Sequence, residues 1–414
     1  MRPVTHRLSA AAFAELATGG GGAAALAELR AAQTSKHRLL VRLAAEESGT
    51  AARAYETLAE LEADAPGEVS DCLRHPAVGA WALRACRGQA DPGRLAAVAL
   101  AAAVRAGAAC RLEVPVPGGR LVLPSLGLLT LPPDGQERVV ATVEPADGGA
   151  RVHAGGRAFL VCPGRDGRDW QALHRMSFGP DTTMTVDDLD PHRWLGDDVA
   201  GRLSPARRRR WSTCLGQAWE ILRTRHATVA AEVGAAVSVL TPILGTAVEQ
   251  RSASARDLFG TIALSDPVDG IGMALTLAHE LQHIKLYALT DLVTLTLPDD
   301  GRRFYAPWRP DPRPLHGLLH GAYAHAAVAA FWRRHLADPE HGAKAEVEFA
   351  RWREASTQVT ATLLDSGGLT EEGTRFVGTL RDTLASLDGE PVSAGAAERA
   401  RLMAEAHRRS HSPG

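Results

Sequence analysis

The sequence predicts an α+β protein that is predominantly helical. Residues 1–110 are rich in Ala, Leu, Arg and Glu at helical spacing, and from 111 to about 165 the period of apolar residues shortens towards two. Helical spacing returns after residue 204. These changes divide the chain into a helical N-terminal region (1–110), a small β-rich insert with loops (111–200) and an α+β domain (201–414) that we expect to carry the chemistry.

Composition narrows the class of protein. The 414 residues are enough for two or three domains, and 45% hydrophobic with 23% charged residues is ordinary for a soluble globular protein. A formal net charge of −2 gives no reason to expect nucleic acid or an anionic membrane as partner. The five cysteines are scattered without a CxxC pair, and no stretch has the pattern of a signal peptide or the length of a membrane span. We therefore expect a cytoplasmic protein.

Helical spacing in the N-terminal region predicts helices over 38–64 and 94–109, and Gly19–Gly22 marks a flexible break after a first helix. After the insert, Ser204-Pro205 is a capped helix start, and the helix is expected to run to about 232. Its arginines, Arg207–Arg210, could bind an acidic ligand. A solvent-exposed charged face is the commoner explanation of such a run, and we favour it. Further helices are expected at about 271–292, 313–336, 341–366, 369–387 and 394–409.

Short extended segments are expected in the insert and before the 271–292 helix. The ranges 112–123 and 137–161 each predict a β-hairpin, whereas 163–200 has little periodicity and predicts a loop with short helical pieces. Strands are expected at 236–243 and 260–265. If the 260–265 strand lies at a sheet edge, a peptide can add to it through main-chain hydrogen bonds.

The most informative stretch is His279-Glu280-Leu281-Gln282-His283 within the 271–292 helix. Two histidines four residues apart stand on one face of a helix, so both imidazoles can reach one metal ion. Glu280 between them can orient or deprotonate a metal-bound water, or it can interact with a metal ligand without binding the metal itself. Strand, turn and metal helix in this order predict a zincin-like metal helix beside a small mixed sheet.

A mononuclear site needs a third protein ligand. Leu286 and Leu289 stand where a metzincin has glycine and histidine, and no glutamate occurs between Ile284 and Pro339 to complete a thermolysin-like site. The next helix offers His320 and His325, five residues apart and about 140° around the helix, so one metal does not normally take both. His325 borders the apolar stripe of that helix and His320 lies near the opposite face, which favours His325.

The segment Tyr305–Pro314 joins the two histidine-bearing helices and contains four prolines. Prolines stiffen a linker, so it can present side chains with little mobility. Arg309 and Arg313 suit a carboxylate co-substrate or a peptide C-terminus, and equally suit ordinary pairing with surface acids.

Three motifs of this region together resemble a known family. They are His279-Glu280-Leu281-Gln282-His283, Tyr305-Ala306-Pro307-Trp308-Arg309 and Tyr323-Ala324-His325. The chain over about 260–335 is similar to the HExxH domain of proteins that modify ribosomally synthesised peptides (RiPPs), found alone or fused to radical-SAM maturases. That family is understood as iron(II)- and α-ketoglutarate-dependent peptide β-hydroxylases.

The resemblance implies His279 and His283 as iron ligands, with the Tyr-Ala-His histidine, His325, as the third. Iron(II) would be the metal, α-ketoglutarate and O₂ the co-substrates, and a precursor peptide the substrate, with a radical-SAM maturase as a possible pathway partner. Arg309, Arg313 or Lys285 would hold the distal carboxylate of α-ketoglutarate, and Glu280 would support the ligands rather than act as a base.

Two alternatives stay open. A zinc metallopeptidase would need Glu280 as general base and no 2-oxo acid. A catalytically silent peptide-binding partner of another maturase would bind peptide without turnover.

Overall fold

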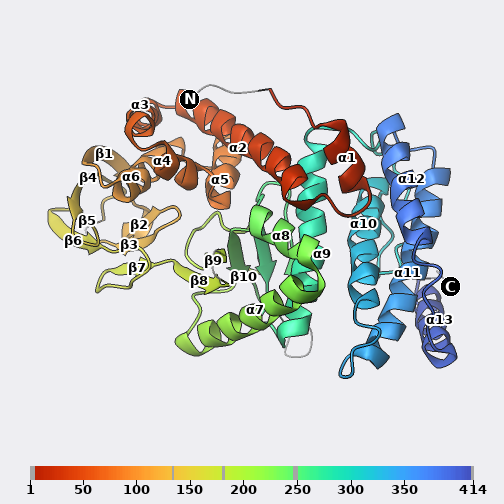
Figure 1. Cartoon of the computed structure of the whole chain (residues 1–414). Helices are drawn as coiled ribbons and strands as arrows, with labels where there is room; N and C mark the ends of the chain where they lie inside the picture. Colours follow the sequence, from red (N-terminus) through yellow and green to blue (C-terminus); the bar gives the residue numbers. More distant parts are fainter. Residues whose placement is uncertain (1–4, 133–134, 180–181, 246–249, 412–414) are drawn as a thin grey trace. The chain divides into compact units, whose positions relative to one another are not determined.

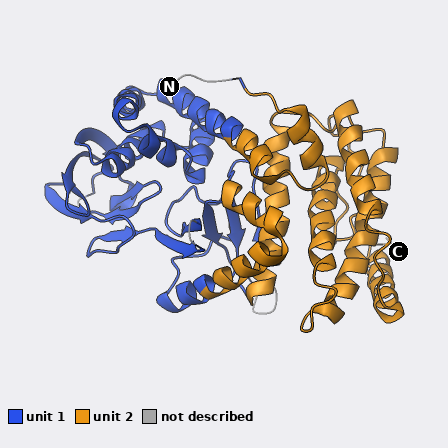
Figure 2. Cartoon of the chain, viewed as in Figure 1, with its two compact units in different colours: residues 1–5, 31–212, 237–267 blue, residues 6–30, 213–236, 268–414 orange. Residues whose placement is uncertain are grey.

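The computed structural model describes residues 5–132, 135–179, 182–245 and 250–411. These residues form many α-helices and three small β-sheets, which confirms a mixed α+β protein that is mostly helical (Figure 1). The chain divides into two compact units, each made of separate stretches (Figure 2). Unit 1 consists mainly of 31–212 and 237–267, and unit 2 of 6–30, 213–236 and 268–414. The division of the chain into the regions 1–110, 111–200 and 201–414 stays a prediction.

The helices of unit 1 surround an alanine-rich helix, α6 (Leu95–Ala106), which is buried from Leu95 to Val104. α3 (Gly49–Asp64), α4 (Pro66–Leu73) and α5 (Pro76–Cys86) complete this helical part, together with the end of α2 (Gly22–Glu46). The helical spacing over 38–64 is confirmed in two helices, the end of α2 and α3, and Ser48 between them caps α3 by accepting the Ala51 N–H at 3.2 Å.

Two antiparallel sheets follow in unit 1. One has the order β1 (Cys110–Pro115), β4 (Arg138–Ala146), β5 (Gly149–Ala154), β6 (Arg157–Val161), and the other β2 (Arg120–Leu123), β3 (Gly127–Thr130), β7 (Trp170–Ala172). The hairpin predicted over 137–161 is confirmed, since β4 and β5 pair across the turn at Gly148. The hairpin predicted over 112–123 is wrong, because its halves, β1 and β2, belong to different sheets.

A mixed five-stranded sheet completes unit 1. Its order is β11 (Ser252–Ala253), β12 (Thr261–Leu264), β10 (Val239–Pro242), β9 (Thr182–Val186), β8 (His174–Phe178). β10 runs parallel to both neighbours, and the two outer pairs are antiparallel. Because β7, β8 and β9 lie within 163–200, the loop predicted there is wrong. β12 has a strand on both sides, so it offers no edge to a peptide and that expectation is also wrong.

Unit 2 is a helical assembly. It contains α1 (Ala10–Ala17), α8 (Ala227–Ala236), α9 (Gly270–Thr290), α10 (Leu315–Arg333), α11 (Gly342–Asp365), α12 (Glu371–Ala385) and α13 (Ala394–Arg409). α10 packs against both α9 and α11, while α12 and α13 pack on α11 and α8 packs on α9 (Figure 1). The helices expected from residue 271 onward are thus confirmed, and the strands expected at 236–243 and 260–265 form β10 and β12.

The helix predicted from Ser204 to 232 is two helices, because α7 (Pro205–Arg225) ends before His226 and α8 begins at Ala227. Ser204 caps α7 as expected, accepting the Arg207 N–H at 3.3 Å. Of its arginine run, Arg207 pairs with Asp266 at 2.8 Å, so the run is not simply a solvated face. Among the described residues no helix is both long and apolar enough to cross a membrane.

Candidate metal centre

The helix α9 places the two motif histidines side by side. Asp269 starts this helix by accepting the Gly272 N–H at 2.7 Å, and the His-Glu-x-x-His motif lies in its middle. The Nε2 atoms of His279 and His283 are 3.3 Å apart, and their rings meet edge to face at 4.9 Å. Both reactive nitrogens therefore point to one place, as the spacing of four residues predicts.

This separation fits a metal ion. Two nitrogens that bind one ion at about 2.0–2.1 Å with a tetrahedral angle lie about 3.3 Å apart. The described residues contain no group of three or more His, Cys, Asp or Glu side chains already at metal-binding spacing. A third ligand would thus have to move towards the His279–His283 pair when an ion binds.

His325 on α10 lies beside His279. The centroids of the two rings are 5.0 Å apart, at an angle of 81°. The His325 Nδ1 is 2.9 Å from the Gly321 carbonyl oxygen, so Nδ1–H donates to it and Nε2 keeps its lone pair. A backbone carbonyl that fixes the histidine tautomer in this way is common around metal-binding histidines.

Two tryptophans enclose the His325 ring. Trp308, from the proline-rich linker, stacks on it at 4.6 Å with only 11° between the planes, and Trp352 of α11 lies 4.4 Å from it. The linker reaches α10 closely because Gly321 has no side chain; a Cβ there would overlap the Trp308 indole. The sequence analysis had singled out the linker that carries Trp308. Nothing in the sequence pointed to Trp352 as a neighbour of the site.

His320 lies on the other side of the pair. Its Nδ1 is 3.4 Å from the Nδ1 of His283, and its ring is 4.3 Å from that of Tyr287. His320 therefore meets the edge of His283 that points away from the His279 Nε2. The argument that placed His320 on an outer face is wrong, because α10 is covered by α9 and by α11 and is buried nearly all round.

All three candidate ligands are held neutral. Burial lowers the pKa of His279, and it lowers that of His325 well below the usual range, with the neighbouring His279 as the next cause. Burial, and then His279, lowers the pKa of His283 to about 4. Neutral imidazole is the form that binds a metal, so the cluster is ready to do so at neutral pH.

Glu280 is 2% exposed and acts on its neighbour electrostatically. Its negative charge opposes the effect of burial and raises the pKa of His279. The carboxylate thus lies near enough to influence the site, in keeping with either role considered for it.

Lys285 is not available to a co-substrate, and that part of the sequence prediction is corrected. It lies two residues after His283, about 200° around the helix. Its ammonium is fully buried and donates to Glu232 Oε2 at 2.9 Å and to the carbonyls of Gly19 and Gly20 at 2.8 and 2.7 Å. A lysine ammonium has three N–H groups, and all three are used.

Arg309 and Arg313 both face Asp311 rather than the histidines. Arg309 is 52% exposed and 3.3 Å from the Asp311 carboxylate, and Arg313 is 35% exposed and 3.0 Å from it. Exposed ion pairs are weak, so either guanidinium can exchange Asp311 for a ligand carboxylate at little cost.

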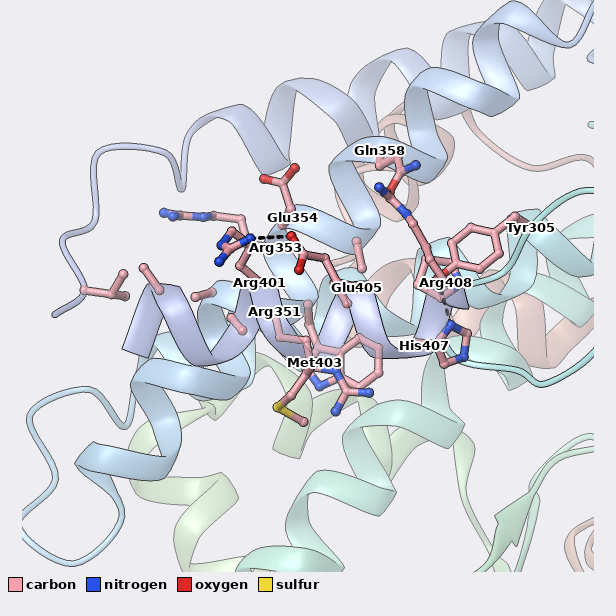
Figure 3. A pocket seen from close by; sticks show the side chains of 18 residues that line it. Tyr305, Arg351, Arg353, Glu354, Gln358, Arg401, Met403, Glu405, His407 and Arg408 are labelled. Atoms are coloured by element: carbon pink, nitrogen blue, oxygen red, sulfur yellow. Dashed lines mark hydrogen bonds and ion pairs between the residues drawn. The ribbon is translucent and has the colours of Figure 1, made fainter. Parts of the chain in front are cut away.

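A cation that the sequence reasoning missed is Arg351 of α11. Its guanidinium lies 4.2 Å above the Trp352 ring, and it makes no ion pair within the described part of the chain. Arg351 lines a cavity of about 410 Å³ between α11, α13 and the linker (Figure 3). The Tyr305 hydroxyl and the His407 Nδ1, 2.7 Å apart, tie the linker to α13 at one end of this cavity. Arginine at one position of a long helix gives no sequence signal.

Comparison with known proteins adds no family to this picture. No protein-family model matches the chain, and no curated protein matches it.

Proposed function

We propose that this chain is an iron(II)- and α-ketoglutarate-dependent dioxygenase that hydroxylates the β-carbon of a residue in a ribosomally synthesised peptide. The observation that supports it is the pair of Nε2 atoms of His279 and His283 at 3.3 Å, with the tautomer-fixed His325 beside them. The family resemblance of these motifs supplies the chemistry. Bound iron(II), α-ketoglutarate and O₂ would together replace a C–H bond of the peptide by C–OH, with release of succinate and CO₂.

Each residue of the site has a role that follows from its contacts. His279, His283 and His325 would hold the metal, because all three are neutral. The Nε2 atoms of His279 and His283 already lie together, and the Nε2 of His325 keeps a free lone pair for the same ion. His320 would orient His283 through its Nδ1, which favours His325 as the third ligand. Trp308 stacks on one face of the His325 ring and Trp352 packs against the ring at a tilt, so both would limit the access of water to His325.

The carboxylate of α-ketoglutarate needs a cation. Arg309 and Arg313 keep this role in the proposal, since Asp311 is their only ion-pair partner among the described residues and both pairs are at least partly exposed. Arg351 is a third candidate, because no ion pair neutralises its guanidinium among the described residues. It lies over the Trp352 ring, and that ring contacts His325. Glu280 would orient His279 rather than take up a proton.

Anaerobic addition of iron(II) and then α-ketoglutarate tests the proposal. We expect a weak visible charge-transfer band that the His279→Ala variant lacks. With a candidate precursor peptide and air, mass spectrometry should show one added oxygen on the peptide and formation of succinate. Bound zinc with peptide cleavage that Glu280→Gln abolishes would instead establish the metallopeptidase. No turnover by the wild-type protein, together with peptide binding that survives His279→Ala, would establish the silent binding partner.

The third ligand is tested by comparing His325→Gln with His320→Gln. We expect His320→Gln to lower iron(II) affinity by about 10- to 100-fold, as loss of a group that orients a ligand does, and His325→Gln to lower it more, because a direct ligand is lost. The reverse order would assign His320 as the ligand.

A further inference from the structure

Unit 1 contains a cavity of about 550 Å³ that the proposed metal chemistry does not use. It lies where the N-terminal end of α6 meets the ends of β1 and β2 and the segment that follows Leu189. Part of its wall is apolar and comes from prolines and aliphatic side chains, namely Pro115, Pro117, Val122, Leu189 and Pro191.

Arginines outnumber acids in the polar wall of this cavity. Four arginines line it, Arg94, Arg120, Arg138 and Arg193, against two acids, Asp91 and Glu137. Asp91 is already paired with Arg138 at 3.0 Å. Arg120 is exposed and has no ion-pair partner within the residues that the structure describes.

Two of the four arginines are fixed in place. Arg94 and Arg193 are both held by Asp190, Arg94 through the buried carboxylate at 2.6 Å and Arg193 through the main-chain carbonyl at 2.7 Å. Burial, and then the nearby Arg94 charge, lowers the pKa of His192 to about 4, so this ring stays neutral and the guanidiniums are the cations.

An acidic group suits the arginines of this wall. Arginine forks bind carboxylates through paired, charge-assisted hydrogen bonds, and preordered arginines lose little entropy in doing so. The apolar wall beside them matches a ligand with a hydrophobic body, and the volume is that of a few amino-acid residues or a medium-chain acid.

We propose that this cavity binds a carboxylate attached to an apolar group, with Arg120 and Arg138 as its contacts at the rim. The carboxylate can come from an acidic segment of a peptide or from a free organic acid. The proposal is independent of the metal site and stands or falls on binding alone.

Isothermal titration of the full-length protein tests it with three probes. The first is the peptide acetyl-Leu-Glu-Pro-Asp-Leu-amide, the second its Gln/Asn counterpart, and the third octanoate. We expect the acidic peptide to bind about tenfold or more tightly than the neutral one, because each charge-assisted hydrogen bond contributes about one order of magnitude. Arg120→Gln should weaken binding about tenfold, and Arg120→Gln/Arg138→Gln further.

Arg111→Gln is the matched control, since Arg111 is an exposed arginine of β1 that does not line the cavity. It should leave affinity within about twofold while all variants keep the wild-type melting temperature. Octanoate binding that depends on Arg120, with no peptide binding, supports the proposal with a free acid as the source. Three results would overturn the proposal. The acidic and neutral peptides bind equally and octanoate binding does not depend on Arg120; no probe binds; or Arg111→Gln weakens binding as much as Arg120→Gln.

Discussion

The buried pair of Lys285 and Glu232 makes a prediction whose size follows from the structure. The two side chains are 0% and 1% exposed, and the Lys285 ammonium also holds the carbonyls of Gly19 and Gly20. Lys285→Met leaves a carboxylate in the interior without its cation. Removing one partner of such a pair costs about 3–5 kcal/mol, a large part of the roughly 5–15 kcal/mol that stabilises a typical domain.

A double-mutant cycle measures the interaction itself. Glu232→Gln keeps an acceptor for the Gly22 N–H, which lies 2.8 Å from Glu232 Oε1. In Lys285→Met/Glu232→Gln both charges are gone, so the loss should fall to about 1–3 kcal/mol, the cost of leaving the two carbonyls unpaired. Urea unfolding followed by circular dichroism should then give a coupling energy of about 2 kcal/mol or more between the two residues.

The surface pair Arg223–Glu220, with side chains 58% and 61% exposed, is the control and should couple by no more than about 1 kcal/mol. A coupling between Lys285 and Glu232 as small as that of the control would refute the reasoning. The same double variant also tests the corrected role of Lys285. It should bind α-ketoglutarate as the wild type does, whereas loss of binding in a folded double variant would return Lys285 to the co-substrate site.

Further predictions concern packing and pH. Gly321→Ala should destabilise the protein by about 1–3 kcal/mol and lower metal affinity, because the new Cβ displaces Trp308. Gly317→Ala on the same helix meets the Arg313 side chain at 3.4 Å and Pro314 at 3.6 Å, which are ordinary contacts, and should be neutral or stabilising. Thermal melts and iron(II) titration measure both; equal effects would contradict the packing argument. Burial, and then a neighbouring histidine, lowers the pKa of His226 to about 3, so its contribution to stability is complete above its usual pKa of about 6.5 and is lost as pH falls towards 3. His226→Phe keeps the ring contact with Phe331, at 4.4 Å in the wild type, and its melting temperature should fall less between pH 7 and pH 5; an unchanged pH dependence would exclude this histidine as a cause.

The sequence predicted those features that depend on local periodicity. The helices that carry His279, His283 and His325 were placed within a few residues of α9 and α10, because their apolar spacing and their capping or proline signals are local. The position of Ser48 as a cap inside an apparently continuous helix was missed, since a serine between helical residues has no distinct periodicity.

Features that depend on tertiary packing escaped the sequence. β1 pairs with β4 rather than with β2, although the local sequence patterns of β2 and β4 are equally compatible with such pairing. The face of α10 was misjudged because the argument assumed one buried side, whereas α9 and α11 cover it from two. Lys285 was taken for a ligand-binding cation because nothing near it in sequence shows Glu232, which lies 53 residues earlier.

The contact between Lys285 and the carbonyls of Gly19 and Gly20, just after α1, has a consequence for the order in which the chain folds during synthesis. Gly19 leaves the ribosome 266 residues before its partner Lys285 does. At about 5–20 residues per second, this is a delay on the order of tens of seconds. Unit 1 lies largely between the two, in residues 31–212 and 237–267, and can be complete during that time. Residues 6–30, which belong to unit 2, therefore remain without their packing partners until then, and chaperone capture of nascent chains should concentrate there.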